Sequence, residues 1–266
     1  MLAELLNRRS GLVIGADKAR LIESKLAPVA RRFGFRNCAE MLGELPWPQE
    51  ELAEAITEAM TTNESSFFRD RVPFDHFRAR ILPELCAARA GKKRLRIWCA
   101  AAATGQEAYS LAMILAETGL IADGWKVDLI ATDLSRAAIA RAREGVYSQY
   151  EAQRGLSVQT LVENFTQEGT NWRIGERLRR MVSFRSFNLL DHYGWLGDID
   201  VVFCRNVLMY LDAHIKAAVL DRISATLAPD GWLILGAKES APGWEADAVR
   251  GVYRGMRMAA AKASVA

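Results

Sequence analysis

The feature that most constrains the fold is an alternation of short apolar segments with longer amphipathic segments, which begins at Arg94. The short apolar runs predict strands, and the longer segments with helical periodicity predict helices. We expect strands at Leu95–Cys99, Val127–Thr132, Val182–Phe187, Val201–Cys204 and Trp232–Leu235, and helices at Gln106–Thr118, Ser135–Glu144 and Ala213–Leu227. This alternation is typical of an α/β protein with a doubly wound, largely parallel sheet. Ligands of such sheets bind beyond the carboxyl ends of the strands.

The first 70 residues have a different pattern and predict a small all-helical domain. Helical periodicity covers Lys18–Phe33 and Glu50–Met60, and Gly34 and the Pro46-Trp47-Pro48 sequence interrupt it. A further helix at about Pro73–Ala90 is expected to connect the two parts. We therefore predict an N-terminal helical domain at residues 1–70 and an α/β domain at residues 71–266.

One segment interrupts the alternation of expected strands and helices. About 36 residues separate the helix that ends near Gly145 from the strand that begins at Val182, and this is long for a connection. Asn171–Ile174 predicts a short strand after a turn, and Leu178–Phe184 is expected to pair back with it. We therefore predict a small antiparallel β insertion at about residues 165–185.

Composition excludes several classes of protein. The four cysteines form no CxxC pair, which argues against a zinc site and a disulfide framework and favours reduced thiols in the cytoplasm. The N-terminus lacks the pattern of a signal peptide, and the longest apolar run, Trp98–Thr104, is too short to span a bilayer. A formal net charge of +3 does not indicate a nucleic-acid partner.

The distribution of charge is more informative than its total. Residues 1–36 carry 8 Lys or Arg against 3 Asp or Glu, whereas residues 37–60 carry six glutamates and no basic residue. Lys18, Lys25 and Arg32 are seven residues apart and lie along one edge of the expected helix. This edge is either a solvated helix face or a docking surface for an acidic partner.

The turn after the first expected strand suits a small ligand. Its small side chains, from Ala100 to Gly105, let the backbone approach closely. The turn lacks the GxGxxG pattern with which dinucleotide folds hold a pyrophosphate. A ligand without phosphate, such as S-adenosylmethionine, does not require these glycines.

Polar residues follow the next strands. Asp133 ends the second strand, where a carboxylate can accept the hydroxyls of a ribose, although it also fits the role of a cap for the following helix. Asn188 and Leu189 follow the third strand and can contact an adenine. Further polar groups, in CRNVLMY (204–210), follow the fourth strand, and such groups are costly beside a buried strand unless they face a cleft. The expected linker also carries a dense polar and aromatic run, TTNESSFFR (61–69).

Together these motifs resemble those of the CheR-type chemotaxis receptor methyltransferases. TTNESSFFRD, WCAAAATGQEAYSLAM, ATDLS, FNLLD, FCRNVLMYLD and LAPDGWLILGAKES occur in the family's order, and the resemblance spans about Gly11 to Tyr253. Three positions depart from the family, which usually has an acid at Gln106, a proline at Ala108 and a threonine at Ser65. The resemblance implies a class I methyltransferase-like sheet and the cofactor S-adenosyl-L-methionine, with S-adenosyl-L-homocysteine as product.

The resemblance also implies site residues and partners. The implied cofactor contacts are Asn63, Ser65, Arg69, Glu107, Asp133, Asn188, Leu189, Arg205 and Asn206. Arg69 and Tyr210 are expected to flank the reacting methyl group as catalytic residues, and no metal is expected. The substrates would be glutamate side chains on the cytoplasmic domains of membrane receptors. We expect a monomeric cytoplasmic enzyme that binds no nucleic acid and does not insert into the membrane.

The chemistry agrees with this expectation, because a glutamate side chain has a pKa near 4.3 and is already a carboxylate nucleophile at neutral pH. No general base is required, and none of the three histidines lies in the motifs. The alternatives are a methyltransferase for small molecules or nucleic acids, a catalytically silent cofactor-binding relative and a nicotinamide oxidoreductase. An aromatic, proline-containing motif after the fourth strand would favour a nucleic-acid methyltransferase, and CRNVLMY contains no such motif.

Overall fold

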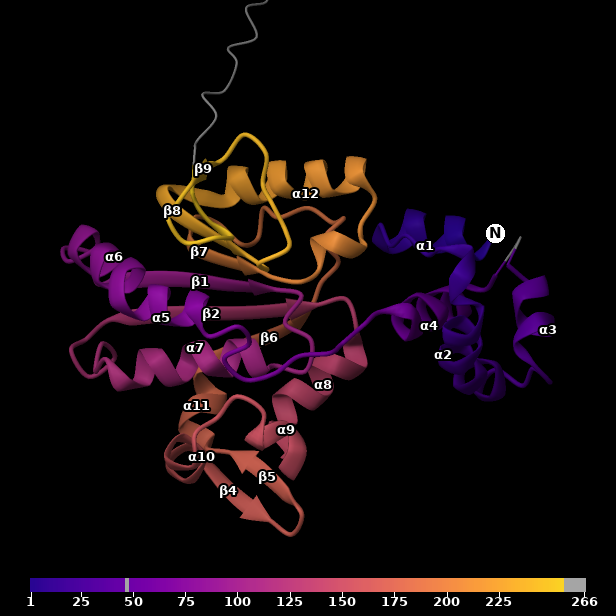
Figure 1. Ribbon diagram of the computed structural model, residues 1–266, viewed down its shortest axis with the longest axis horizontal. Coiled ribbons are helices and arrows are strands. Elements are labelled where there is room, and N and C mark those ends of the chain that lie inside the picture. The colour runs from indigo at the N-terminus through magenta and orange to yellow at the C-terminus, as the bar shows by residue number, and fades with distance from the viewer. Residues whose placement is uncertain (46–47, 256–266) are drawn as a thin grey trace, which may run out of the picture.

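The computed structural model describes residues 1–45 and 48–255. Figure 1 shows three parts: a central sheet with helices on both sides, a helical lobe beside it and a small β insertion below it in this view. Pro46 and Trp47, where the sequence predicts a break between helices, lie outside the described residues.

The central sheet has seven strands in the order β6-β2-β1-β7-β8-β10-β9. The strands are β1 (Arg94–Ala100), β2 (Lys126–Asp133), β6 (Val182–Ser186), β7 (Ile199–Cys204), β8 (Leu227–Leu235), β9 (Glu245–Ala246) and β10 (Val252–Arg254). The first five strands in this order pair in parallel, and β10 pairs antiparallel with β8 and β9. The predicted α/β fold with a largely parallel sheet is confirmed. The carboxyl ends of β6, β2, β1 and β7 therefore meet at one edge.

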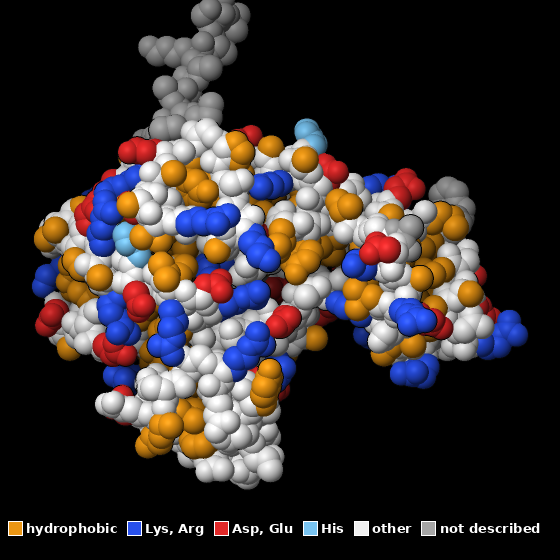
Figure 2. All heavy atoms as spheres, in the orientation of Figure 1, with side chains coloured by type: hydrophobic (Ala, Val, Ile, Leu, Met, Phe, Trp, Pro, Cys, Tyr) orange, Lys and Arg blue, Asp and Glu red, His pale blue; other side chains and the backbone are white. Residues whose placement is uncertain are grey.

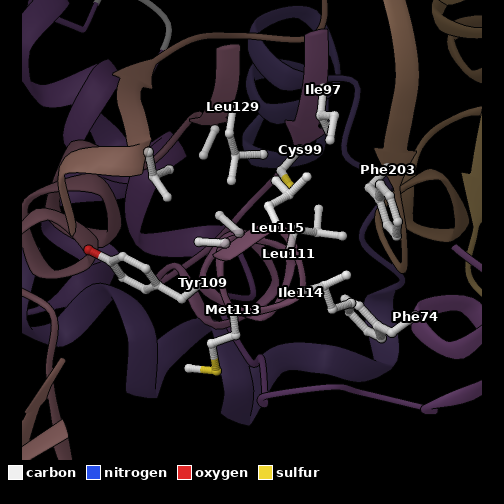
Figure 3. Close-up of a cluster of buried hydrophobic side chains, with 14 of the residues drawn as sticks. Phe74, Ile97, Cys99, Tyr109, Leu111, Met113, Ile114, Leu115, Leu129 and Phe203 are labelled. Carbon is white, nitrogen blue, oxygen red and sulfur yellow. The ribbon is translucent and has the colours of Figure 1, made fainter. Parts of the chain in front are cut away.

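Alternate residues of each strand point to opposite faces of the sheet, and an apolar cluster is buried on each face. In β1, Ile97 and Cys99 join one apolar cluster and Trp98 joins the other. Figure 3 shows Ile97, Cys99 and Leu129 of the strands near side chains of α7 (Gln106–Glu117). The other sheet-flanking helices are α5 (Val72–His76), the π-helical segment η2 (Phe77–Ile81), α6 (Leu82–Ala88), α8 (Arg136–Glu144) and α12 (Ala213–Thr226).

The helical lobe has its own apolar core. It contains α1 (Leu2–Ser10), the 3₁₀ turn η1 (Ala16–Lys18), α2 (Ala19–Arg32), α3 (Cys38–Gly43) and α4 (Glu50–Met60). Fully buried side chains from each of the four α-helices fill this core: Leu6, Leu26, Met41 and Ile56. Its buried side chains form a cluster separate from the two on the sheet. The lobe therefore packs beside the sheet and does not form a helical layer on either face of it.

The insertion differs from the prediction. Its elements are β3 (Val146–Ser148), α9 (Gln149–Gln153), α10 (Val158–Asn164), β4 (Phe165–Glu168) and β5 (Asn171–Ile174), and its sheet has the order β3-β5-β4. The predicted pairing of Leu178–Phe184 with Asn171–Ile174 is wrong. Leu178 lies in α11 (Glu176–Met181), and β6 pairs with β2 of the central sheet. Val182 and Phe184 are buried there, so the apolar side chains of this segment are satisfied by the main core.

Candidate active site

A cavity opens at the edge where the carboxyl ends of the strands meet, between the sheet and the helical lobe. It encloses about 910 Å³, with the open space at its mouth included. Nine of the ten residues expected at the site line it: Ser65, Arg69, Glu107, Asp133, Asn188, Leu189, Arg205, Asn206 and Tyr210. Asn63 is not among the lining residues.

Asp133 is held by the backbone of two turns. It ends β2 and is 6% exposed. One carboxylate oxygen, Oδ2, accepts the N–H of Ala103 at 2.8 Å, and the other, Oδ1, accepts the N–H of Ser135 at 2.9 Å. Burial raises the pKa of Asp133 above its ordinary value, and these two N–H donors oppose that effect. Each oxygen keeps acceptor capacity for a further donor in the cavity.

The turn between β1 and α7 brings the backbone toward Asp133. Ala101 and Ala103 have positive φ angles of 59° and 49°, which cost non-glycine residues conformational energy. The turn is anchored by the N–H of Ala102, which donates to the carbonyl of Thr132 at 2.8 Å. The strained turn thus holds the N–H of Ala103 against the carboxylate of Asp133.

Glu107 and Arg205 form a buried ion pair beside the cavity. The NH1 atom of Arg205 donates to Oε2 of Glu107 at 2.9 Å, and only 1% of the Arg205 side chain is exposed. The NH2 atom donates to the carbonyl of Arg69 at 2.9 Å and to Oδ2 of Asp70 at 2.8 Å. Burial raises the pKa of Glu107, and the charge of Arg205 opposes this. Arg205 therefore ties α7 to the turn that carries Arg69.

The turn that carries Arg69 is strained. Phe68, Asp70 and Arg71 have positive φ angles of 45°, 65° and 44°. Its anchors include the Ser110 hydroxyl, which accepts the N–H of Phe68 at 2.9 Å, and the Glu64 carbonyl, which accepts from NH1 of Arg69 at 3.2 Å. Clusters of strained residues that the surrounding structure enforces occur preferentially at functional sites.

Asn188 and Leu189 follow β6 on another wall of the cavity. The Nδ2 atom of Asn188 donates to the carbonyl of Arg9 at 2.6 Å, and its Oδ1 accepts the N–H of Leu190 at 3.0 Å. The side-chain amide is therefore partly used to attach the end of α1 to the sheet. Leu189 and the nearby Phe187 are half-buried and give this wall an apolar surface.

Asn206 and Tyr210 lie in the loop after β7. Asn206 has a φ of 58°, and its N–H donates to Oε2 of Glu239 at 2.7 Å. Tyr210 ends the 3₁₀ turn η3 (Leu208–Tyr210) and is 41% exposed at the cavity. Its carbonyl accepts the N–H of Val13 at 2.9 Å. The phenol is thus accessible, whereas its backbone is fixed.

The sequence analysis did not identify two residues that line the cavity from outside the motifs, or a buried carboxylate that supports its wall. Ser10 and Leu12 line the cavity from the segment after α1, and no local pattern marked them. The buried carboxylate of Glu239 accepts backbone N–H groups of Asn206, Gly236 and Met209. Glu239 follows β8, so the rule that identified Asp133 at the end of a strand could also have identified it.

Two departures from the family pattern lie away from the cavity. The Oε1 atom of Gln106 accepts the Thr104 hydroxyl at 2.8 Å, and Gln106 is buried without lining the cavity. Ala108 is fully buried in the apolar core around α7. Ser65 lines the cavity and supplies a hydroxyl where the family usually has a threonine.

Comparisons with known proteins agree with this geometry. The family described as "CheR methyltransferase, SAM binding domain" matches residues 63–251. Chemotaxis protein methyltransferase 1 of Pseudomonas aeruginosa is 41% identical over 88% of this chain and 87% of its own length. Chemotaxis protein methyltransferase Cher2 of Pseudomonas putida is 38% identical over 90% and 88%. A chemotaxis protein methyltransferase of Vibrio parahaemolyticus is 36% identical over 91% and 88%. This chain belongs to the CheR methyltransferase family.

Proposed function

We propose that this chain is an S-adenosyl-L-methionine-dependent protein-glutamate O-methyltransferase that acts on chemotaxis receptors and releases S-adenosyl-L-homocysteine. One observation carries the proposal: a single cavity at the carboxyl edge of the sheet is bordered by Asp133, Glu107, Arg69 and Tyr210. Within the described residues, no histidine or cysteine lines this cavity. A cavity without a histidine or cysteine suits transfer of a methyl group to a nucleophile that is already ionised and needs no general base.

The residues of the cavity fit the cofactor. The carboxylate of Asp133 has acceptor capacity left for ribose hydroxyls, and Glu107 offers a second carboxylate for the cationic part of the cofactor. Leu134, Phe187 and Leu189 supply apolar surface for the adenine. The cavity thus has the mixture of carboxylate and apolar groups that this ligand requires.

The cofactor supplies a methyl group on an electrophilic sulfonium. The protein needs to align a glutamate carboxylate of the substrate with this methyl group and to exclude water. The carboxylate is ionised at neutral pH, so the new C–O bond forms without removal of a proton. We assign Arg69 to hold one carboxylate oxygen and Tyr210 to donate a hydrogen bond to the other. The anchored backbone of each residue supports these roles.

Two surfaces are proposed for receptor binding. The lobe at residues 1–70 would dock the acidic methylation region, and Figure 2 shows several Lys and Arg side chains along the lower side of this lobe. The insertion would bind a receptor tail as an added strand, because β4 is an outer strand of its sheet. No helix within the described residues is long and apolar enough to cross a membrane.

The function can be tested with the purified protein, S-adenosyl-L-homocysteine and a receptor cytoplasmic fragment. Wild-type protein should bind the product and transfer labelled methyl groups to glutamates of the fragment. Asp133→Ala should weaken binding by about 1.5–3 kcal/mol, since it removes hydrogen bonds to a charged acceptor. Binding of the product without methylation of any receptor fragment would indicate a silent cofactor-binding relative and contradict the proposal.

A further inference from the structure

Glu58, a residue of the helical lobe, contacts the start of a helix in the α/β part. It lies on α4, and its Oε1 atom accepts the Ser135 hydroxyl at 2.8 Å and the N–H of Ala137 at 2.7 Å. The unpaired N–H groups at the start of α8 favour a carboxylate at this position. Glu58 thus supplies a cap for α8 from a different part of the protein.

Ser135 connects this cap to the cofactor cavity. Its hydroxyl donates to Glu58 and accepts the N–H of Ala138 at 3.0 Å, while its own N–H donates to Oδ1 of Asp133 at 2.9 Å. A displacement of Ser135 would therefore move a donor to the carboxylate that is assigned to the ribose. Only one residue separates Ser135 from Asp133 along the chain.

The same helix also leads directly into another part of the cavity wall. α4 ends at Met60, and Thr61, Thr62 and Ser65 line the cavity immediately afterwards. Glu58 is therefore close in sequence to one wall and hydrogen-bonded to the residue that orients the other. The Glu58 contact thus links these two walls.

We propose that Glu58 is a positioning residue for cofactor binding, through which the helical lobe sets the geometry of the cavity around Asp133. The inference rests on the proposed function, because it requires Asp133 to hold the cofactor. Glu58 does not line the cavity, so its effect on cofactor affinity is indirect. A partner that shifts the lobe would, by the same link, change cofactor affinity.

Glu54 provides a matched control one turn earlier on α4. It also reaches α8, where its Oε2 lies 3.3 Å from NH1 of Arg136. The two side chains of this pair are 41% and 70% exposed, and the pair has no hydrogen bond to Asp133 or Ser135. Glu54→Ala thus removes a contact between the same two helices without disturbing the link to the cavity.

The test compares S-adenosyl-L-homocysteine affinity, measured by calorimetry on the full chain, with the melting temperature of each variant. Glu58→Ala should weaken binding about tenfold, because it frees Ser135, whose N–H orients the Asp133 carboxylate, and the loss of one such hydrogen bond to a charged group is of this order. Glu54→Ala should bind like wild type. Both donors contact the same oxygen of Glu58, so Glu58→Gln should restore most of the affinity with its amide oxygen. Glu58→Asp, which is shorter by one methylene, should resemble Glu58→Ala and provides a second test if the alanine variant unfolds.

Two results would overturn the inference. One is equal affinity of Glu58→Ala, Glu54→Ala and wild type for the product. The other is an equal loss of affinity in Glu58→Ala and Glu58→Gln, which would show that the hydrogen-bonding oxygen does not matter. Failure of the wild type to bind the product would instead remove the proposed function together with the inference.

Discussion

Arg205 is the most completely enclosed charged side chain of the cavity wall, and its partners explain how it is tolerated. Burying a guanidinium costs free energy unless its charge is paired and its donors are used. Glu107 pairs with it, the carbonyl of Arg69 and the carboxylate of Asp70 accept two further bonds, and the ring centre of Phe74 lies 5.4 Å from the guanidinium carbon. The buried Nε atom of Arg205 has no hydrogen-bond partner among the described residues. Loss of Arg205 would leave Glu107 buried without its cation, so this residue serves structure and site together.

Tyr210 permits a test at the residue level that separates catalysis from binding. Tyr210→Phe removes the phenolic hydroxyl but keeps the carbonyl that accepts from Val13, so the fold should be retained. We expect a lower methylation rate with product affinity close to wild type, because the hydroxyl is assigned to the substrate carboxylate. Single-turnover methylation and calorimetry measure the two quantities. Loss of product affinity would place Tyr210 in the cofactor site, and an unchanged rate would remove it from the mechanism.

The raised pKa values of Asp133 and Glu107 predict a pH dependence of cofactor binding. Burial favours the protonated form of each carboxyl group. A protonated Asp133 carries an O–H donor, whereas its ionised form offers only acceptors to the ribose hydroxyls. As pH falls, affinity for S-adenosyl-L-homocysteine should therefore begin to decline before the pH reaches 3.8, the ordinary pKa of an aspartate. Calorimetry across pH measures this decline. Asp133→Asn should reduce the dependence, and an identical pH profile in this variant would contradict the assignment.

At the scale of elements, the insertion packs directly on the turn that carries Arg69. The ring of Phe67 lies 5.0 Å from that of Tyr147 in β3 and 5.5 Å from that of Phe165 in β4, and both contacts are edge-to-face. The Tyr147 hydroxyl also donates to the carbonyl of Thr104, in the turn before α7, at 2.8 Å. The insertion therefore supports two walls of the cavity in addition to its proposed role in receptor binding.

Gly155 is the position at which this packing is most sensitive. A Cβ atom there would lie 1.9 Å from the carbonyl oxygen of Phe67, and its φ of 103° disfavours any other residue. Gly155→Ala should lower the free energy of unfolding by about 2–4 kcal/mol, from backbone strain and overpacking. Chemical denaturation measures this change. Gly169→Ala, with a φ of 62° and no atom near its Cβ, is the control and should show only the smaller cost of strain. Equal losses in both variants would show that the contact with Phe67 is unimportant.

At the scale of the whole molecule, the three basic residues proposed for docking are not equivalent. Lys18 and Arg32 are exposed and form exposed ion pairs with Asp17 and Glu51. Lys25 is half-buried, and its Nζ donates to the carbonyl of Thr61 at the cavity wall. Burial lowers the pKa of Lys25. Lys25 thus has a structural partner, whereas the two exposed residues remain available to steer an acidic receptor.

This difference can be measured through the salt dependence of methylation. Lys18→Glu combined with Arg32→Glu should slow receptor methylation at low salt and have little effect at high salt, because ions screen steering between exposed charges. Lys25→Met should reduce product affinity at any salt concentration, because it detaches Thr61. Lys92→Glu with Lys126→Glu is the control, since these exposed residues lie near the amino ends of β1 and β2. Wild-type rates in the first double variant at low salt would show that this helix edge is not the dock.

The sequence determined those parts of the protein that depend on local pattern. The strands and helices expected for the central sheet lie close to their positions in the structure, although β8 begins at Leu227, five residues before the expected Trp232. Buried parallel strands read as continuous apolar runs, which made them recognisable. In such a sheet, residues directly after the carboxyl end of a parallel strand lie where ligands bind. Asp133 and Asn206 could therefore be placed at the cavity before its walls were known.

Only the tertiary structure decided how distant segments share the cavity. No local sequence pattern identifies Ser10 and Leu12. They reach the site because Leu12 pairs with Leu211, which is distant in the sequence. The segment at Leu178–Phe184 contains apolar residues that fit either the insertion or the central sheet. In the structure its second half belongs to β6, which pairs with the edge of β2. Glu58 likewise looks like one of several surface glutamates in the sequence. Its partner, the start of α8, is 77 residues away, and only packing of the lobe against the sheet brings the two together.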